Sequence, residues 1–210
     1  LLDRAGVQPR ADQIVGRSVD GFTVGFPTEV ALADRRSLVA VGMNGEPLPP
    51  AHGFPARLVV PGLYGYVSAT KWLSEVELTT WDAFDAYWVP RGWAKEAPIK
   101  TQSRIDVPRP GSTVDGGPLV VAGVAWAPTK GITAVEVRID GGDWVQAEVS
   151  EPLGDAAWVQ WRATVQVAAG TPHTCEVRAT DGTGETQTDT VRPPAPDGAT
   201  GWHLVEFDTA

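Results

Sequence analysis

The stretch from Gly42 to Leu73, GMNGEPLPPAHGFPARLVVPGLYGYVSATKWL, constrains the fold more than any other part of the chain. Half of its first fourteen residues are glycine or proline. Asn44-Gly45 favours a tight turn with positive φ, and the prolines that follow stiffen the backbone. A short apolar strand, Leu58–Val60, comes next and is closed by Pro61-Gly62. Gly62 and Gly65 then bracket an expected loop whose backbone amides can approach a ligand closely. The stretch therefore predicts rigid turns around one short strand.

The same stretch is unusual in its charge. Residues 47–74 contain no aspartate or glutamate, although the chain has a formal net charge of -9. Arginine offers a planar fork of donors and lysine a compact charge, and both suit phosphate. The alternative interpretation is a Pro/Gly-rich linker between strands whose charges face solvent. The candidate groups for an anion cradle are His52, Arg57, Ser68, Thr70 and Lys71.

Composition narrows the class of protein. With 210 residues, 42% hydrophobic and 20% charged, the chain has the composition of a globular protein with one large or two modest domains. The acidic balance argues against nucleic-acid binding, which needs clustered Lys and Arg. The longest apolar run, Leu119–Ala127, is too short for a membrane helix and predicts a buried strand. A single cysteine, Cys175, excludes an intrachain disulfide, and its alternation with Val177 predicts a core position.

Local patterns in the first half predict short elements. Thr28, with Glu29 in the first turn after it, is the expected N-cap of one or two helical turns. The segment Trp81–Trp93 is aromatic-rich and is interrupted by Pro90 and Gly92, which is typical of a packed loop. The expected helices are Leu1–Ala5 and Thr28–Asp34. The expected strands are one beginning at Ile14-Val15, those at Gly21–Phe26 and Trp72–Thr80, and a short buried one at Leu38–Val41.

The second half alternates regularly, with turn signals every eight to fourteen residues. This spacing predicts an antiparallel β-sandwich. Asp140-Gly141-Gly142-Asp143 resembles a calcium-binding turn, but a bare hairpin is the favoured interpretation. The expected strands are Leu119–Trp126, Ile132–Asp140, Trp144–Val149, Trp158–Val167, Thr174–Thr180 and Trp202–Phe207.

The run MNGEPLPPAHGFPARLVVPGLYGYVSATKWL is similar to a motif of the sulfite oxidase family of molybdopterin enzymes, which has the form MNG-x-PLP-x-x-HGFP-x-R-x-x-VPG-x-x-G followed by S-x-KWL. The resemblance implies that His52, Arg57, Ser68 and Lys71 hold the pterin cofactor, chiefly at its phosphate. This chain has one extra residue before the lysine, so Thr70 is an alternative to Ser68. The acidic cofactor contact that precedes the motif in the family corresponds to Asp20.

The resemblance also bears on the substrate. Family members carry an aromatic-rich loop near the substrate pocket, often with a tyrosine ahead of a basic-Gly pair. Here Pro90 stands ahead of Arg91-Gly92, so Tyr87 and Arg91 are the candidate substrate contacts. Sulfite-oxidising members place an arginine near a glycine shortly before the closing Trp-His. This chain has Asp197-Gly198 there, so sulfite or nitrate is not the expected substrate.

Two further implications concern completeness and assembly. The cysteine that ligates molybdenum in this family lies upstream of the region matched here. We therefore expect the chain alone to lack that thiolate, to hold no metal through its own residues, to bind molybdopterin poorly and to be inactive. The pattern VEV-x-x-DGG-x-W with VRATDG-x-G-x-TQ resembles the sandwich that follows the cofactor domain and mediates dimers.

The sequence thus predicts an α+β, mainly β, protein. Residues 1–97 would be the later half of a molybdopterin-binding domain, and residues 98–210 an immunoglobulin-like β-sandwich for dimerisation. The expected activity of the intact protein is oxygen-atom and two-electron transfer at a molybdenum–molybdopterin centre, with an electron-transfer partner that the sequence does not identify. The resemblance implies an extracytoplasmic location in a bacterial cell. The alternative function is a non-catalytic binding or assembly module with a positively charged loop.

Overall fold

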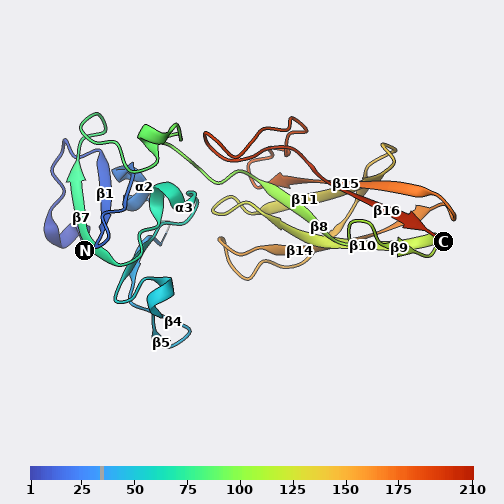
Figure 1. Ribbon diagram of the computed structural model, residues 1–210, viewed down its shortest axis with the longest axis horizontal. Coiled ribbons are helices and arrows are strands. Elements are labelled where there is room, and N and C mark those ends of the chain that lie inside the picture. The colour runs from blue at the N-terminus through green and yellow to red at the C-terminus, as the bar shows by residue number, and fades with distance from the viewer. Residues whose placement is uncertain (34–35) are drawn as a thin grey trace. The chain divides into compact units, whose positions relative to one another are not determined.

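The computed structural model describes residues 1–33 and 36–210 and divides into two compact units (Figure 1). The first unit holds Leu1–Ile99 together with Pro194–Gly198. The second unit holds Lys100–Pro193 together with Ala199–Ala210.

The division differs in two places from a single cut after residue 97. Residues 98 and 99 stay with the first unit, where the backbone N–H of Ile99 donates to the Gly62 carbonyl over 2.9 Å. Residues 194–198 also belong to it, because the Pro196 carbonyl accepts a hydrogen bond from the backbone N–H of Ala94 at 2.8 Å. Sequence patterns do not reveal the second feature, since it depends on a contact between segments a hundred residues apart.

The first unit is built on an antiparallel sheet in the order β2-β1-β7, formed by Thr23–Pro27, Gln13–Ser18 and Leu73–Thr79. Val15 lies at its centre, opposite Gly25 on one side and Glu77 on the other. Three short helices accompany the sheet: α1 (Leu2–Ala5), α2 (Thr28–Leu32) and α3 (Gly65–Ser68). The core of the unit gathers Ile14, Val24, Phe26, Leu58, Val60, Leu63, Val67 and Ala97.

The motif stretch folds as two small antiparallel pairs. β3 (Leu38–Ala40) pairs with β6 (Arg57–Val59), and β4 (Gly42–Met43) pairs with β5 (Glu46–Pro47). Asn44 and Gly45 join the second pair with φ values of 54° and 83°, so the predicted turn with positive φ is confirmed.

Three local predictions in this unit are wrong. The strand predicted at Leu38–Val41 is not buried, because Leu38 is 48% exposed and Val41 is 67% exposed. The N-cap of α2 is Pro27 rather than Thr28, whose hydroxyl is buried instead. The helix ends at Leu32, and the predicted end at Asp34 lies outside the described residues. Gly65 begins helix α3, where a loop was expected.

The second unit is a sandwich of two sheets. One has the order β13-β14-β10-β8, formed by Glu148–Val149, Val159–Val167, Gly117–Trp126 and Gln102–Val107. The other has the order β12-β11-β15-β16-β9, formed by Val145–Gln146, Ile132–Ile139, Pro172–Asp181, His203–Thr209 and Thr113–Val114. Alternate residues of both sheets share one core, which includes Trp161 and Phe207. The mainly β class is confirmed; the immunoglobulin type stays a prediction.

One predicted strand of the sandwich is wrong in an informative way. Trp144–Val149 was expected as a single strand, but β12 pairs with β11 and β13 pairs with β14, in different sheets. Ala147 lies between them, is buried, and donates its N–H to the Val135 carbonyl over 2.8 Å. The chain crosses from one sheet to the other at this residue.

Across the described residues, none of the helices has the length and apolar character needed to cross a membrane.

Candidate cofactor site

The basic side chains of the motif converge on one turn of 3-10 helix, η1 (Pro50–His52). Three side chains donate hydrogen bonds to three successive carbonyls of this turn. Trp72 Nε1, Lys71 Nζ and Arg57 Nη1 reach the carbonyls of residues 50, 51 and 52 over 2.8, 3.3 and 3.2 Å. The turn therefore brings a guanidinium and an ammonium group onto neighbouring backbone positions, although they are fourteen residues apart in the sequence.

Gly53 makes this convergence possible. Its φ of 107° lies in a region that favours glycine. A side chain added at Gly53 would lie 3.0 Å from the Cβ of Lys71 and 3.2 Å from the Cβ of Arg57. The absence of a side chain thus allows the two segments that carry the basic residues to pack against the turn.

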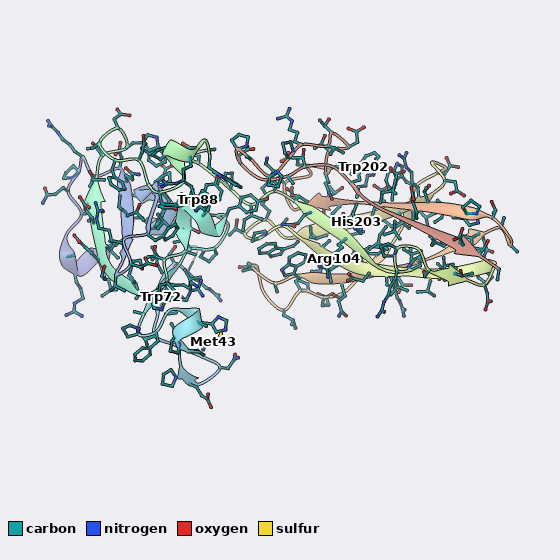
Figure 2. The ribbon with its side chains drawn as sticks, viewed as in Figure 1. Met43, Trp72, Trp88, Arg104, Trp202 and His203 are labelled. Carbon is teal, nitrogen blue, oxygen red and sulfur yellow. The ribbon has the colours of Figure 1, made fainter. Side chains whose placement is uncertain are left out.

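A cavity of about 440 Å³ opens beside this turn, and Trp72 and Trp88, both labelled in Figure 2, contribute to its lining. It brings together three of the predicted site residues, Asp20, Lys71 and Tyr87. No sequence motif marked the other lining residues, although aromatic residues flanking a lysine are a signal that could have pointed to a planar ligand. These are Ser18, Gly21, Phe22, Ala69, Trp72 and Trp88.

Asp20 presents an ionised acceptor at the cavity. Its carboxylate accepts a hydrogen bond from the backbone N–H of Phe22 at 3.0 Å. This bond, together with the Ser18 hydroxyl and the more distant charge of Lys71, holds the pKa of Asp20 below its ordinary value. The cavity therefore carries a negative and a positive group.

Tyr87 and Arg91 form a unit of their own. The guanidinium of Arg91 lies 3.7 Å from the centroid of the Tyr87 ring and also donates to the Tyr87 carbonyl. Tyr87 packs against Phe22 and Trp88, with ring centroids 5.4 and 5.2 Å away. Tyr87 thus belongs to the wall of the cavity, whereas Arg91 is not among the residues that line it.

The predicted hydroxyl and imidazole groups have different surroundings. Ser68 is buried, and its Oγ lies 3.0 Å from the Tyr64 carbonyl and 3.3 Å from the Leu63 carbonyl, so it donates to the backbone just before its own helix. Thr70 is fully buried, and its Oγ1 has no partner among the described residues. His52 is exposed and uses its carbonyl rather than its ring in the turn. Their roles toward a cofactor stay predictions.

The cysteine and the calcium-like turn of the second unit have structural roles. Cys175 is fully buried in the core, as predicted, and burial raises the pKa of its thiol to about 12. The Asp140 carboxylate bonds His173 Nδ1 at 2.7 Å and the backbone N–H of Thr174 at 2.8 Å. Within residues 1–33 and 36–210, no group of three or more His, Cys, Asp or Glu side chains is placed to hold a metal ion.

The chain is similar in sequence to known proteins over most of its length. The family model "Oxidoreductase molybdopterin binding domain" matches residues 1–88. The chain is 35% identical to sulfite oxidase of Gallus gallus over 182 residues, which cover 74% of this chain and 39% of that protein. It is 33% identical to mitochondrial sulfite oxidase of Homo sapiens, over 74% of this chain and 33% of the relative. The chain therefore spans well under half of these relatives.

A solved structure extends the similarity over both units. The sulfane dehydrogenase SoxCD from Paracoccus pantotrophus superposes with a TM-score of 0.72 and 29% sequence identity, over 89% of this chain and 50% of that chain. The chain belongs to the sulfite oxidase family of molybdopterin-binding oxidoreductases.

Proposed function

We propose that this chain is part of a molybdopterin-dependent oxidoreductase and that its first unit holds the phosphorylated end of the pterin. The observation that carries the proposal is the grouping of Arg57 and Lys71 on one 3-10 turn, with Lys71 also lining the cavity beside Asp20. Both cations donate to backbone carbonyls, and neither forms an ion pair with a carboxylate among the residues that the structure describes, so their charge stays available for an anion.

Unused hydrogen-bonding groups support the same assignment. Arg57 Nε and Thr70 Oγ1 are both buried and lack a partner among the described residues. A buried donor left unsatisfied costs about 1–3 kcal/mol, so native structures usually provide a partner. This corner of the unit therefore has the donor set that a phosphate group requires, and the residues present fit the implied cofactor.

The remaining residues have complementary roles in this proposal. Asp20 would accept hydrogen bonds from the pterin N–H groups, while Phe22, Trp72, Tyr87 and Trp88 would pack against the planar ring and exclude water. When bound, the molybdenum–pterin centre supplies oxygen-atom transfer coupled to the exchange of two electrons. The residues of this chain contribute binding, orientation and charge to that chemistry.

The charge near the end of the first unit favours a substrate other than sulfite. Asp197 lies in the segment that packs on this unit, and it adds to burial in raising the pKa of Tyr66. A carboxylate at this position would repel a dianion. If this proposal holds, Asp197→Arg in the intact enzyme will increase turnover of sulfite relative to the natural residue; unchanged or lower sulfite turnover would count against it.

The sandwich is proposed to form the interface of a homodimer. The intact protein is proposed to lie outside the cytoplasm. Apolar side chains are exposed on strands of both sheets, with Val120 54% and Leu204 47% exposed. Such positions suit a symmetric contact. Analytical ultracentrifugation of the chain should show a dimer that Leu204→Glu or Val120→Glu dissociates, and fractionation of cells should place the intact protein outside the cytoplasm.

Ligand binding tests the central proposal. Purified wild-type chain is expected to bind a phosphorylated pterin weakly and to contain far less than stoichiometric molybdenum, because the one cysteine of this chain is buried in the sandwich. Arg57→Ala and Lys71→Ala should each weaken pterin binding about tenfold, the effect of losing one charged hydrogen bond. Arg10→Ala is the control, since Arg10 is an exposed cation of the same unit.

Two results, one on molybdenum content and one on pterin binding, would contradict parts of this proposal. Stoichiometric molybdenum in the purified chain would contradict the expected lack of a metal-ligating thiolate. Equal pterin binding by the wild type and both alanine variants would favour the alternative function, a non-catalytic module whose basic loop meets an acidic partner. In the intact protein, Arg57→Ala should lower the molybdenum content.

A further inference from the structure

The loop Trp81–Trp93 supplies two lining residues of the cavity, Tyr87 and Trp88, but little of it is regular. Its one helical element is the 3-10 turn η2 (Val89–Arg91). Backbone groups of such a loop need side-chain partners if the loop is to keep one conformation. The side chains that bind this loop therefore decide where the aromatic rings lie.

Lys95 is the side chain with the most extensive hold on the loop. Its ammonium group donates to the carbonyls of Trp81 and Phe84, the latter at 2.7 Å, and to the Asp85 carboxylate at 2.9 Å. These bonds use all three donors that a lysine has. The ammonium also lies 4.7 Å from the centroid of the Trp81 ring. The side chain of Lys95 is only 17% exposed.

The two carbonyl contacts matter more than the ion pair. The Asp85 side chain is 57% exposed, and an exposed pair of this kind stabilises a protein little. The carbonyls of Trp81 and Phe84, by contrast, are backbone groups of the loop itself. Lys95 follows the loop in sequence, so its side chain folds back and closes the loop from the far end.

Other contacts tie the loop to the sheet without replacing Lys95. Asp12 accepts a hydrogen bond from the backbone N–H of Trp81, and Thr23 accepts one from the backbone N–H of Tyr87 at 3.0 Å. The guanidinium of Arg17 lies 4.8 Å from the Phe84 ring centroid. These contacts fix single points, whereas Lys95 joins residues 81, 84 and 85 to the segment that follows the loop.

We propose that Lys95 is a positioning residue that holds Tyr87 and Trp88 at the cavity. Lys95 does not line the cavity, so it acts through these rings. It sets the affinity for the planar ring of the ligand, while the affinity for phosphate depends on Lys71 and Arg57. This inference rests on the proposed function, because it assigns part of that same site.

Binding of two probes separates the two contributions. The full chain and its Lys95→Met variant are titrated with inorganic phosphate and with the phosphate ester of 6-hydroxymethylpterin, and binding is followed by NMR of the indole N–H groups. Lys95→Met should weaken the pterin ester about tenfold, the effect of losing well-placed ring stacking, and leave phosphate binding unchanged. Lys95→Arg retains donors for the carbonyls and should recover most of the pterin affinity.

A matched control comes from the second unit. Lys130 also ties a loop, through Asp181 at 2.9 Å and Glu185 at 3.4 Å, so Lys130→Met removes a comparable lysine and should leave both probes unaffected. Equal pterin affinity in Lys95→Met and the wild type would overturn the proposal. An equal loss of both probes would overturn it too, because Lys95 would then act on the unit as a whole.

The wild type binding neither probe would count against the proposed function. In that case the environment of the Trp88 ring can still be measured without ligand. The chain is labelled with 5-fluorotryptophan, and the ¹⁹F resonance of Trp88 is compared between variants. Lys95→Met should shift and broaden this resonance, and Lys130→Met should not. An unchanged Trp88 resonance in Lys95→Met would show that Lys95 does not position the ring.

Discussion

The two units satisfy their buried polar groups to different degrees. In the first unit, five side chains carry a buried nitrogen or oxygen without a partner among the described residues, whereas in the second only Trp161 does. Gln13 is the extreme case, since it is fully buried and both atoms of its amide lack a partner. The others in the first unit are Thr28, Ser37, Arg57 and Thr70.

The second unit shows what full satisfaction looks like. Asp181 is completely buried, and its carboxylate accepts hydrogen bonds from Lys130 Nζ, the Thr101 hydroxyl, and the backbone N–H and hydroxyl of Thr183. Burial alone would raise the pKa of Asp181, but these donors hold it well below its ordinary range. A buried charge is tolerated in this unit because its partners are built in.

The contrast indicates different tasks. Apart from Trp161, the buried polar side chains of the sandwich find partners within the unit, so it is suited to be a scaffold. In the first unit, Arg57 Nε and Thr70 Oγ1, on the segments that carry the two cations, have no partner among the described residues, which is the pattern of a site completed by another molecule. Four predictions test this contrast, in order of decreasing effect.

The largest effect is expected in the sandwich, at Gly123. A Cβ at this position would lie 1.9 Å from the Arg104 carbonyl oxygen, so the two strands must separate to admit it. Gly123→Ala should lower the free energy of unfolding by about 3 kcal/mol, measured by urea denaturation. Gly154→Ala, where a Cβ meets nothing within 4 Å, is the control. Similar stabilities of the two variants would contradict the close approach of the Arg104 carbonyl to Gly123.

The equivalent position in the first unit is Gly53, and its replacement should affect binding as well as stability. Gly53→Ala places a side chain against Lys71 and Arg57 at a φ of 107°. The expected loss of stability is about 2 kcal/mol, with weaker binding of the phosphorylated pterin. Gly45→Ala also has positive φ but open surroundings, so it should destabilise without changing binding. Unaltered binding by Gly53→Ala would separate the turn from the site.

Replacing one buried polar residue in each unit should change the free energy of unfolding in opposite directions. Gln13→Met removes an unpartnered amide at similar volume and should raise the free energy of unfolding by about 1 kcal/mol. Ser103→Ala in the second unit removes a hydroxyl that donates to Gln187 at 2.8 Å and should lower it by about 1 kcal/mol. Destabilisation by both, in urea denaturation, would mean that the Gln13 amide is satisfied in solution.

The smallest effect is a pH dependence of the second unit. His173 is buried, with Nδ1 facing Asp140 and Nε2 facing the Ala168 carbonyl at 2.9 Å, and these acceptors raise its pKa above the ordinary value. Because the folded-state pKa is raised, the protonated His173 contributes fully to the free energy of unfolding below about pH 6.5. This contribution is lost as the pH rises through the folded-state pKa. The loss should be about 1 kcal/mol or less.

The contribution of Asp140 to stability depends on pH in the opposite direction. Its pKa is lowered by the Thr174 N–H and by His173, although burial opposes this, so its contribution is lost only as pH falls through that lowered value. Stability should therefore be greatest at mildly acidic pH, between the two losses. Unfolding curves across pH and NMR titration of His173 measure both, and Asp140→Asn should reduce the pH dependence above pH 6.5 without abolishing it, because the Ala168 carbonyl still favours the protonated imidazole.

The sequence was sufficient for the mainly β class, most strands of the sandwich and the Asn44-Gly45 turn. These features follow from period-two alternation and from the φ preferences of single residues, which are local. It was insufficient for the split at Ala147, because one alternating pattern suits a strand in either sheet. It also missed the return of residues 194–198, since nothing in their composition indicates which surface they contact.

For the candidate site, the sequence determined the chemistry and the tertiary structure decided the geometry. The absence of acidic residues from 47–74 and the presence of Arg57 and Lys71 already indicated an anion site. That both cations bond to one 3-10 turn, and that Lys71 shares a cavity with Asp20 and Tyr87, depends on segments far apart in the chain. Side-chain type is fixed by the sequence, whereas proximity results from packing the whole unit.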